Sequence, residues 1–247
     1  MNMKIPRAVI PGLVTVGNLF MGFYSVICAC TGRISLACWC IIMAAILDAV
    51  DGKVARLTKT SSPFGVEYDS LADVVSFGFA PSFLIYILFS ESMSLLLLLI
   101  SFLPLLAGSI RLARFNIQQG GFDKKYFVGF AIPSGAITLA SFILFSLYFY
   151  DQPLRYPAVM LFLVVTVSIL MVSTVRYELM PNLLNISSLN QKLQLFIGVV
   201  VLIILILFPR QTLFPLIMVY MLSGIIRWIL NLLFHSNKGE SSLESKS

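Results

Sequence analysis

Residues 34–56 read ISLACWCIIMAAILDAVDGKVAR, an apolar run whose last third carries two aspartates, Asp48 and Asp51. Two more, Asp69 and Asp73, lie where the next apolar segment begins. A run of about 20 apolar residues can cross a bilayer as a helix. Because carboxylates are costly there, those that occur usually serve a function. The four aspartates are therefore the first candidates for a functional site.

The composition independently indicates an integral membrane protein. Hydrophobic residues make up 59% of the 247 residues and charged residues 11%, and the mean hydropathy is +0.95. Such a chain lacks the polar surface that a soluble domain requires. We expect an all-α bundle of about eight transmembrane helices in one catalytic domain, residues 1–235, followed by a polar, disordered cytoplasmic tail, 236–247. The expected spans are 8–30, 34–56, 70–90, 93–114, 129–149, 157–175, 193–208 and 212–234.

The basic residues predict the orientation. If the N-terminus is cytoplasmic, 14 of the 17 lysines and arginines lie at the cytoplasmic ends, and only Arg33, Arg155 and Arg210 fall outside. By the positive-inside rule, both the N-terminus and the aspartates are cytoplasmic. We expect the bacterial inner membrane, whose anionic lipids attract the net charge of +6.

The spacing of the aspartates predicts a metal site. Residues three or four apart share a helix face, so Asp48 pairs with Asp51 and Asp69 with Asp73, about 5 to 6 Å apart at Cβ. Hard cations suit such oxygen ligands, which favours Mg²⁺ or Mn²⁺, with Ca²⁺ also possible. Two ions about 3.5 to 4 Å apart would clamp a phosphate during in-line displacement. The alternative is two helix ends with ordinary solvated charges.

The residues between the aspartates favour a phosphate ligand. Gly52 and Ala55 are small and leave room for a ligand near the backbone, and the Arg56 guanidinium suits bidentate contact with phosphate. The whole pattern, D-x2-D-G-x2-A-R-x8-G-x3-D-x3-D, resembles the signature of the CDP-alcohol phosphatidyltransferase family. Every specified position is filled, including Gly65.

Flanking segments are similar to one subfamily, the phosphatidylserine synthases. The similar segments are 70–81, 111–116, 127–133 and 171–177. Two positions depart from the expected pattern. Gly12 stands where asparagine usually follows the proline of the first helix, and Ala131 interrupts a usual Gly-Leu-Pro, which affects the fit of the acceptor pocket.

The resemblance implies the CDP-alcohol phosphotransferase fold and transfer of the phosphatidyl group of CDP-diacylglycerol to L-serine, in a homodimer among membrane lipids. It implies no nucleic-acid partner. The divalent metal would be held by Asp48, Asp51, Asp69 and Asp73, and Asp73 would also be the general base. The CDP moiety would be bound by Gly52, Ala55, Arg56 and Gly65.

Several roles stay open at this point. Asn18 either makes a hydrogen bond between helices or, as the resemblance implies, approaches the nucleotide. Arg111, Arg114 and Asn116 either hold the serine carboxylate or lipid phosphate or form a cytoplasmic charge cluster. The acceptor could instead be glycerol 3-phosphate or inositol phosphate, and a different class would be an ion or metal transporter with an aspartate site.

The cysteines and the histidine suggest no metal site. The cysteines form two C-x-C pairs, and within each pair the two side chains point to different sides of a helix. Buried free thiols are therefore expected, or a disulfide if this end of the helices is periplasmic. The single histidine, His235, is expected at the surface. The cysteines are Cys28, Cys30, Cys38 and Cys40.

Overall fold

The computed structural model describes residues 9–58, 63–92, 94–118, 126–178, 198 and 200–244. Side chains are described at 12–54, 64–91, 94–117, 129–175, 198 and 200–230. The predicted site residues Ala55 and Arg56 lie on a described helix, but their side chains fall outside these ranges, as does the side chain of His235.

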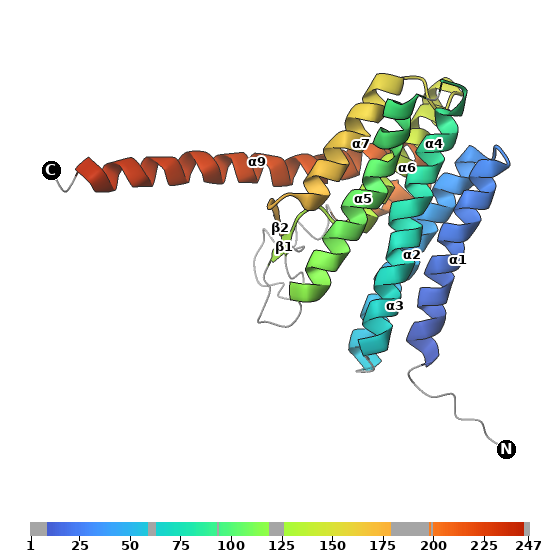
Figure 1. Ribbon diagram of the computed structural model, residues 1–247, viewed down its shortest axis with the longest axis horizontal. Coiled ribbons are helices and arrows are strands. Elements are labelled where there is room, and N and C mark those ends of the chain that lie inside the picture. The colour runs from blue at the N-terminus through green and yellow to red at the C-terminus, as the bar shows by residue number, and fades with distance from the viewer. Residues whose placement is uncertain are drawn as a thin grey trace, which may run out of the picture.

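Helices make up nearly all of the described chain (Figure 1). One π-helical stretch, η1, and one 3-10 turn, η2, interrupt them, and two short strands form the only sheet in the described residues. The bounds are α1 (Val9–Cys30), α2 (Ile34–Thr58), α3 (Pro63–Asp73), η1 (Val74–Phe79), α4 (Ala80–Leu88), η2 (Ser90–Ser92), α5 (Leu95–Gln118), β1 (Tyr126–Val128), α6 (Ile132–Tyr150), α7 (Pro157–Val172), β2 (Arg176–Glu178) and α9 (Pro209–Glu244).

The chain is a multi-pass membrane protein, and the all-α prediction is confirmed. Six helical segments within the described residues are long and apolar enough to cross a membrane, and α7 is a shorter apolar helix. The expected span at 193–208 lies partly outside the described residues, although 200–207 are helical. The six segments are Gly12–Cys30, Ile34–Val54, Phe64–Leu88, Leu95–Ile117, Ile132–Tyr150 and Pro209–Leu230.

The third helical segment begins earlier than the sequence predicted. We expected a span at 70–90, whereas α3 begins at Pro63 and continues without a break through η1 and α4. Proline fits the first position of a helix, because its missing N–H is unpaired there in any case. The earlier start places both Gly65 and Asp69 inside the helix.

A tight turn makes α1 and α2 antiparallel neighbours. Gly32 adopts a positive φ of 72°, which suits glycine and commonly ends a helix. The Arg33 N–H donates to the Cys28 carbonyl at 2.8 Å and the Gly32 N–H to the Ala29 carbonyl at 3.1 Å. Because the chain reverses here, the last turns of α2 lie beside the first half of α1.

A short sheet holds the start of α6 against the end of α7. β1 and β2 pair antiparallel, with Phe127 opposite Tyr177. Beyond β1, Gly129 has a φ of 81° and donates its N–H to the Val175 carbonyl at 2.8 Å. A Cβ at Gly129 would lie 2.6 Å from the Met171 carbonyl oxygen, so this close approach requires glycine.

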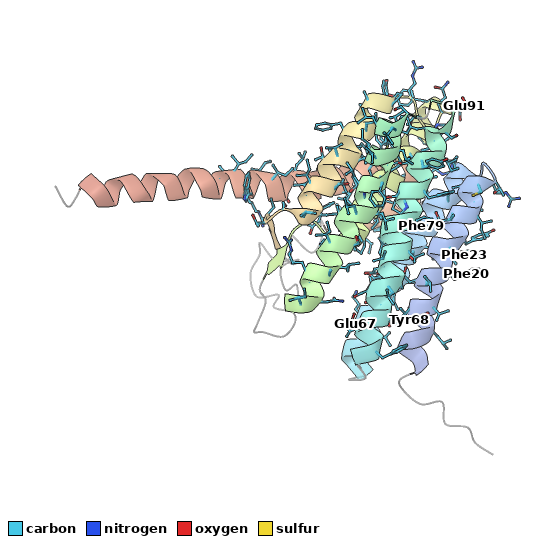
Figure 2. The ribbon with its side chains drawn as sticks, viewed as in Figure 1. Phe20, Phe23, Glu67, Tyr68, Phe79 and Glu91 are labelled. Carbon is cyan, nitrogen blue, oxygen red and sulfur yellow. The ribbon has the colours of Figure 1, made fainter. Side chains whose placement is uncertain are left out.

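Large apolar side chains cover the outside of the bundle. Phe20, Phe23 and Phe79 are exposed, at 54%, 56% and 41%, and Figure 2 shows them away from the interior. In water such a surface would be unfavourable, whereas lipid tails solvate it. This agrees with phenylalanine serving as lipid-facing packing. The four cysteines are free thiols, three of them buried.

Helix α9 includes the predicted last span, 212–234, and continues into the predicted tail. In Figure 1 it runs across the direction of the other helices, and its C-terminal part extends away from the bundle. It packs on α6 near its start, where Phe214 contacts Phe142 with ring centroids 5.1 Å apart. The predicted disordered tail began at residue 236, but α9 continues through Glu244. Extending an existing helix requires no new nucleus, which offsets the polar composition.

Candidate functional site

Four helical elements surround a cavity of about 290 Å³ at the end of the bundle where α2 and α5 end and α3 and α6 begin. Asp48 comes from α2, Asp69 and Asp73 from α3, and Arg111 from α5. The start of α6, at Ile132 and Pro133, closes the far side. Predicted site residues from three separate segments therefore meet at one place.

Three of the four aspartates form one group. Asp48, Asp69 and Asp73 each offer an oxygen, and these three oxygens lie within 4.8 Å of one another. Asp69 and Asp73 are one turn apart on the same face of α3. Asp69 Oδ1 is buried and has no hydrogen-bond partner. Close carboxylates repel each other unless a cation neutralises them, so these oxygens fit a hard divalent ion.

Asp51 has a different environment. Its side chain is 6% exposed, and Oδ2 accepts a hydrogen bond from the Thr15 hydroxyl of α1. The group of three does not include it. Its Oδ1 is buried without a hydrogen-bond partner. The role of Asp51 as a fourth metal ligand stays a prediction.

Asn18 connects α1 to the carboxylate group. The side chain is fully buried, and its Nδ2 donates to Asp73 Oδ1 at 3.1 Å. From η1, the Ser76 hydroxyl donates to the Asn18 carbonyl at 2.9 Å. The interhelical role of Asn18 is thus confirmed. Its Oδ1 is buried without a hydrogen-bond partner and can accept a hydrogen bond from a ligand.

The π-helical stretch directly after Asp73 brings α1 and Ser76 into close contact. A Cβ at Gly22 would lie 2.6 Å from the Ser76 Cα, a distance that backbone atoms cannot tolerate. One extra residue in the turn shifts the helix face, and such stretches are frequent at functional sites. Here η1 allows Ser76 to reach Asn18 while Asp73 still faces the cavity.

We expect Gly22→Ala to destabilise the protein. The added methyl group forces α1 and η1 apart, and overpacking of this kind costs about 1 to 3 kcal/mol. Thermal unfolding in detergent measures the effect. Gly17→Ala is the matched control on the same helix, because its Cβ would meet only the end of the Leu47 side chain at 3.4 Å. Equal behaviour of the two variants would contradict this assignment.

Arg111 and Arg114 occupy different environments although they are three residues apart on α5. Arg111 is 7% exposed, lines the cavity, and has a buried Nε without a hydrogen-bond partner. Arg114 instead donates from Nη1 to the Val172 carbonyl at 3.0 Å and from Nη2 to the Ser173 carbonyl at 3.3 Å. It therefore satisfies the last carbonyls of α7, and only Arg111 faces the site.

Asn116 completes the polar wall of the cavity. Its Nδ2 donates to the Ser70 hydroxyl at 3.0 Å and lies 3.4 Å from Glu67 Oε2. Ser70 also donates to the Val66 carbonyl at 3.1 Å. These contacts fix the Asn116 amide beside the carboxylates, and its role toward a substrate stays a prediction.

The predicted CDP-binding glycines, Gly52 and Gly65, lie at the surface. A Cβ at Gly52 would meet nothing within 4 Å, and both Gly52 and Gly65 are exposed. The surrounding protein therefore does not require glycine at position 52. This agrees with a ligand approaching the backbone there, and the role of both glycines stays a prediction.

Thr15, Ser70 and Ser76 also belong to the site, and the sequence analysis did not single them out. A signal was present for the first: Thr15, Asn18 and Gly22 follow at spacings of three and four, so they share one face of an otherwise apolar helix. The contact of Ser76 depends on η1, and no sequence pattern indicated that stretch.

A family model described as CDP-alcohol phosphatidyltransferase matches residues 8–170. The chain is 35% identical to a CDP-diacylglycerol–serine O-phosphatidyltransferase of Helicobacter pylori over 94% of this chain and 98% of that one. It is 34% identical to the enzyme of the same name from Methanocaldococcus jannaschii, over 76% and 82%. An archaetidylserine synthase of Methanothermobacter thermautotrophicus is 36% identical over 68% and 69%.

Proposed function

The chain belongs to the CDP-alcohol phosphatidyltransferase family, and from that premise we propose that it transfers the phosphatidyl group of CDP-diacylglycerol to the hydroxyl of L-serine. The products are phosphatidylserine and CMP. The observation that carries the proposal is the cavity in which Asp48, Asp69 and Asp73 face Arg111. An acidic group that suits a metal and the guanidinium of Arg111 thus line the same small space.

In the reaction, the serine hydroxyl oxygen attacks the phosphorus that carries diacylglycerol. A new O–P bond forms, the bond from that phosphorus to the bridging oxygen breaks, and CMP leaves with the bridging oxygen. The hydroxyl proton passes to Asp73, the general base. Asn18 donates to Oδ1 of Asp73, which orients the carboxylate and leaves Oδ2 for the proton.

Divalent metal belongs to this chemistry in the family, and the three carboxylates fit it. We propose that Asp48, Asp69 and Asp73 hold it, with Asp51 completing a two-ion site of Mg²⁺ or Mn²⁺. A metal held there would supply positive charge to the pyrophosphate and to the leaving CMP. We assign Gly52, Ala55, Arg56 and Gly65 to the CDP moiety.

The lining of the cavity favours serine over phosphorylated acceptors. Glycerol 3-phosphate or inositol phosphate carries an additional phosphate, which demands additional cationic ligands. Among the described residues that line the cavity, Arg111 is the only basic one. A single guanidinium matches the single carboxylate of serine. Release of CMP in detergent, measured with each acceptor in turn, tests this choice, and equal rates with glycerol 3-phosphate would overturn it.

We expect Arg111→Lys to raise the apparent KM for serine about 10-fold and to leave the KM for CDP-diacylglycerol near its starting value. Lysine keeps the charge but loses the planar fork that pairs bidentately with a carboxylate. Arg114→Lys is the matched control: it should lower the unfolding temperature through the lost contacts to α7 and leave both KM values unchanged. A rise confined to CDP-diacylglycerol would assign Arg111 to the lipid phosphate instead.

We expect Gly52→Leu to weaken the binding of CDP-diacylglycerol about 10-fold or more without unfolding the bundle. Because a Cβ there would meet no atom within 4 Å apart from its chain neighbours and the backbone of its own helix, the loss would come from the ligand. Gly52→Ala should give a smaller loss together with a slightly more stable helix. Calorimetric titration measures binding, and unchanged affinity in the leucine variant would remove Gly52 from the site.

We place the aspartate end in the cytoplasm, in a bacterial inner membrane, because 14 of the 17 basic residues then lie inside. Labelling of cysteines introduced at exposed positions from either side of the membrane tests this orientation.

We also propose a homodimer on the strength of the family membership, and mass measurement in detergent or nanodiscs tests it.

A further inference from the structure

A second and larger cavity lies at the opposite end of the bundle. Its volume is about 590 Å³, and it lies between the α1–α2 turn, the loop after α6 and the start of α9. Its lining includes Gly32, Arg33, Trp39, Leu147, Pro153 and Arg210. Asp48 follows the start of α2 by 14 residues, about 21 Å along a helix. This cavity is therefore separate from the catalytic one.

The charge of the cavity is entirely positive. Arg33 and Arg210 line it, and none of its lining residues is acidic. Both arginines are exposed, and among the described residues neither guanidinium has a side chain as its partner in an ion pair or a hydrogen bond. Two like charges that line one space repel each other unless an anion lies between them. The pair therefore fits a phosphate group, which each guanidinium can contact bidentately.

The location selects a lipid rather than a soluble anion. The apolar span of α2 begins at Ile34, one residue after Arg33, and the apolar span of α9 begins at Pro209, one residue before Arg210. Both guanidinium groups are thus attached at the boundary between apolar and polar surroundings, the depth of lipid headgroups. Trp39, a residue type enriched at that boundary, lines the same cavity.

The distribution of basic residues makes the pair unusual. Among the residues whose side chains are described, three arginines and no lysine lie at this end of the bundle: Arg33, Arg155 and Arg210. Two of the three line the one cavity, whereas Arg155 does not. Arginines that served only as solvated charges would not be expected to line one cavity together.

We propose that this cavity binds the phosphodiester headgroup of an anionic phospholipid in the leaflet opposite the active site. A lipid with net negative charge is favoured over a zwitterionic one, because the lining offers two cations to the phosphate but no carboxylate to pair with an ammonium group. The site is independent of the transfer reaction, and its occupant is held rather than converted.

Native mass spectrometry of the full-length protein tests the proposal, with phosphatidylglycerol and phosphatidylcholine added at equal concentrations. We expect the natural chain to retain phosphatidylglycerol preferentially. The double variant Arg33→Gln/Arg210→Gln should lose about 10-fold in affinity for it, the scale of one lost charge-assisted contact. Arg155→Gln is the matched control and should bind like the natural chain.

Three results would overturn the proposal. One is an unchanged lipid preference in the double variant, and another is an equal loss in Arg155→Gln. The third is displacement of phosphatidylglycerol by millimolar inorganic phosphate, which would make the cavity a site for soluble anions. The single variants Arg33→Gln and Arg210→Gln repeat the measurement with one charge retained, so misfolding of the double variant does not decide the outcome. CMP release by each variant reports that the catalytic end is folded.

Discussion

Replacing Asp73 with asparagine is expected to lower CMP release by about 100-fold or more while the protein still inserts and folds. General base catalysis raises a rate about 10²- to 10⁴-fold, and the asparagine side chain cannot take the serine proton. Asparagine is nearly isosteric, and its carbonyl oxygen can still accept from Asn18 Nδ2, the donor that lies 3.1 Å from Asp73 Oδ1. The contact between α1 and α3 should therefore survive, so the loss would be chemical rather than structural.

Asp151→Asn is the matched control for that variant. Asp151 is an exposed acid at the opposite end of the bundle, in the turn after α6, with a φ of 53°. Asparagine tolerates this left-handed conformation, so turnover and unfolding temperature should stay unchanged. Initial rates with saturating serine and CDP-diacylglycerol measure the effect. If the Asp73 variant kept more than about a tenth of the natural rate, Asp73 would not be the general base.

Both the helices and the acidic group could be predicted from the sequence because the chain is strongly apolar. In a chain this apolar, a carboxylate stands out, and helical spacing alone places Asp69 and Asp73 on one face. The family signature then joins Asp48 to them. The structure agrees, because the α1–α2 hairpin and the start of α3 at Pro63 bring these three residues together.

Other features depended on tertiary packing and left little trace in the sequence. Arg111 and Arg114 are three residues apart, and spacing predicts the same face for both. Long flexible side chains can turn to different partners, however, and the carbonyls at the end of α7 bind Arg114. The pairing of Thr15 with Asp51 and the course of α9 across the bundle likewise follow from neighbouring helices rather than from local pattern.

The second large effect concerns the carboxylate group as a metal site. Asp69→Asn is expected to lower the affinity for Mn²⁺ at least about 10-fold, because an amide oxygen replaces a charged ligand. Asp69 Oδ1 has no hydrogen-bond partner, so the substitution breaks no hydrogen bond to that atom. Binding is measured by electron paramagnetic resonance of Mn²⁺ without substrates, which separates the metal site from catalysis.

Turnover should follow binding. EDTA is expected to abolish CMP release by the natural chain, and Mg²⁺ or Mn²⁺ should restore it. The Asp69 variant should need a higher Mn²⁺ concentration for half-maximal rate, and Asp151→Asn should match the natural chain in both measurements.

The Asp51→Asn variant tests whether Asp51 is a fourth metal ligand, because Asp51 lies outside the group of three and accepts a hydrogen bond from Thr15. A loss of Mn²⁺ affinity in that variant would place Asp51 among the ligands, whereas unchanged affinity would leave three carboxylates to hold the metal. Full turnover after exhaustive chelation would contradict a metal role for every one of them.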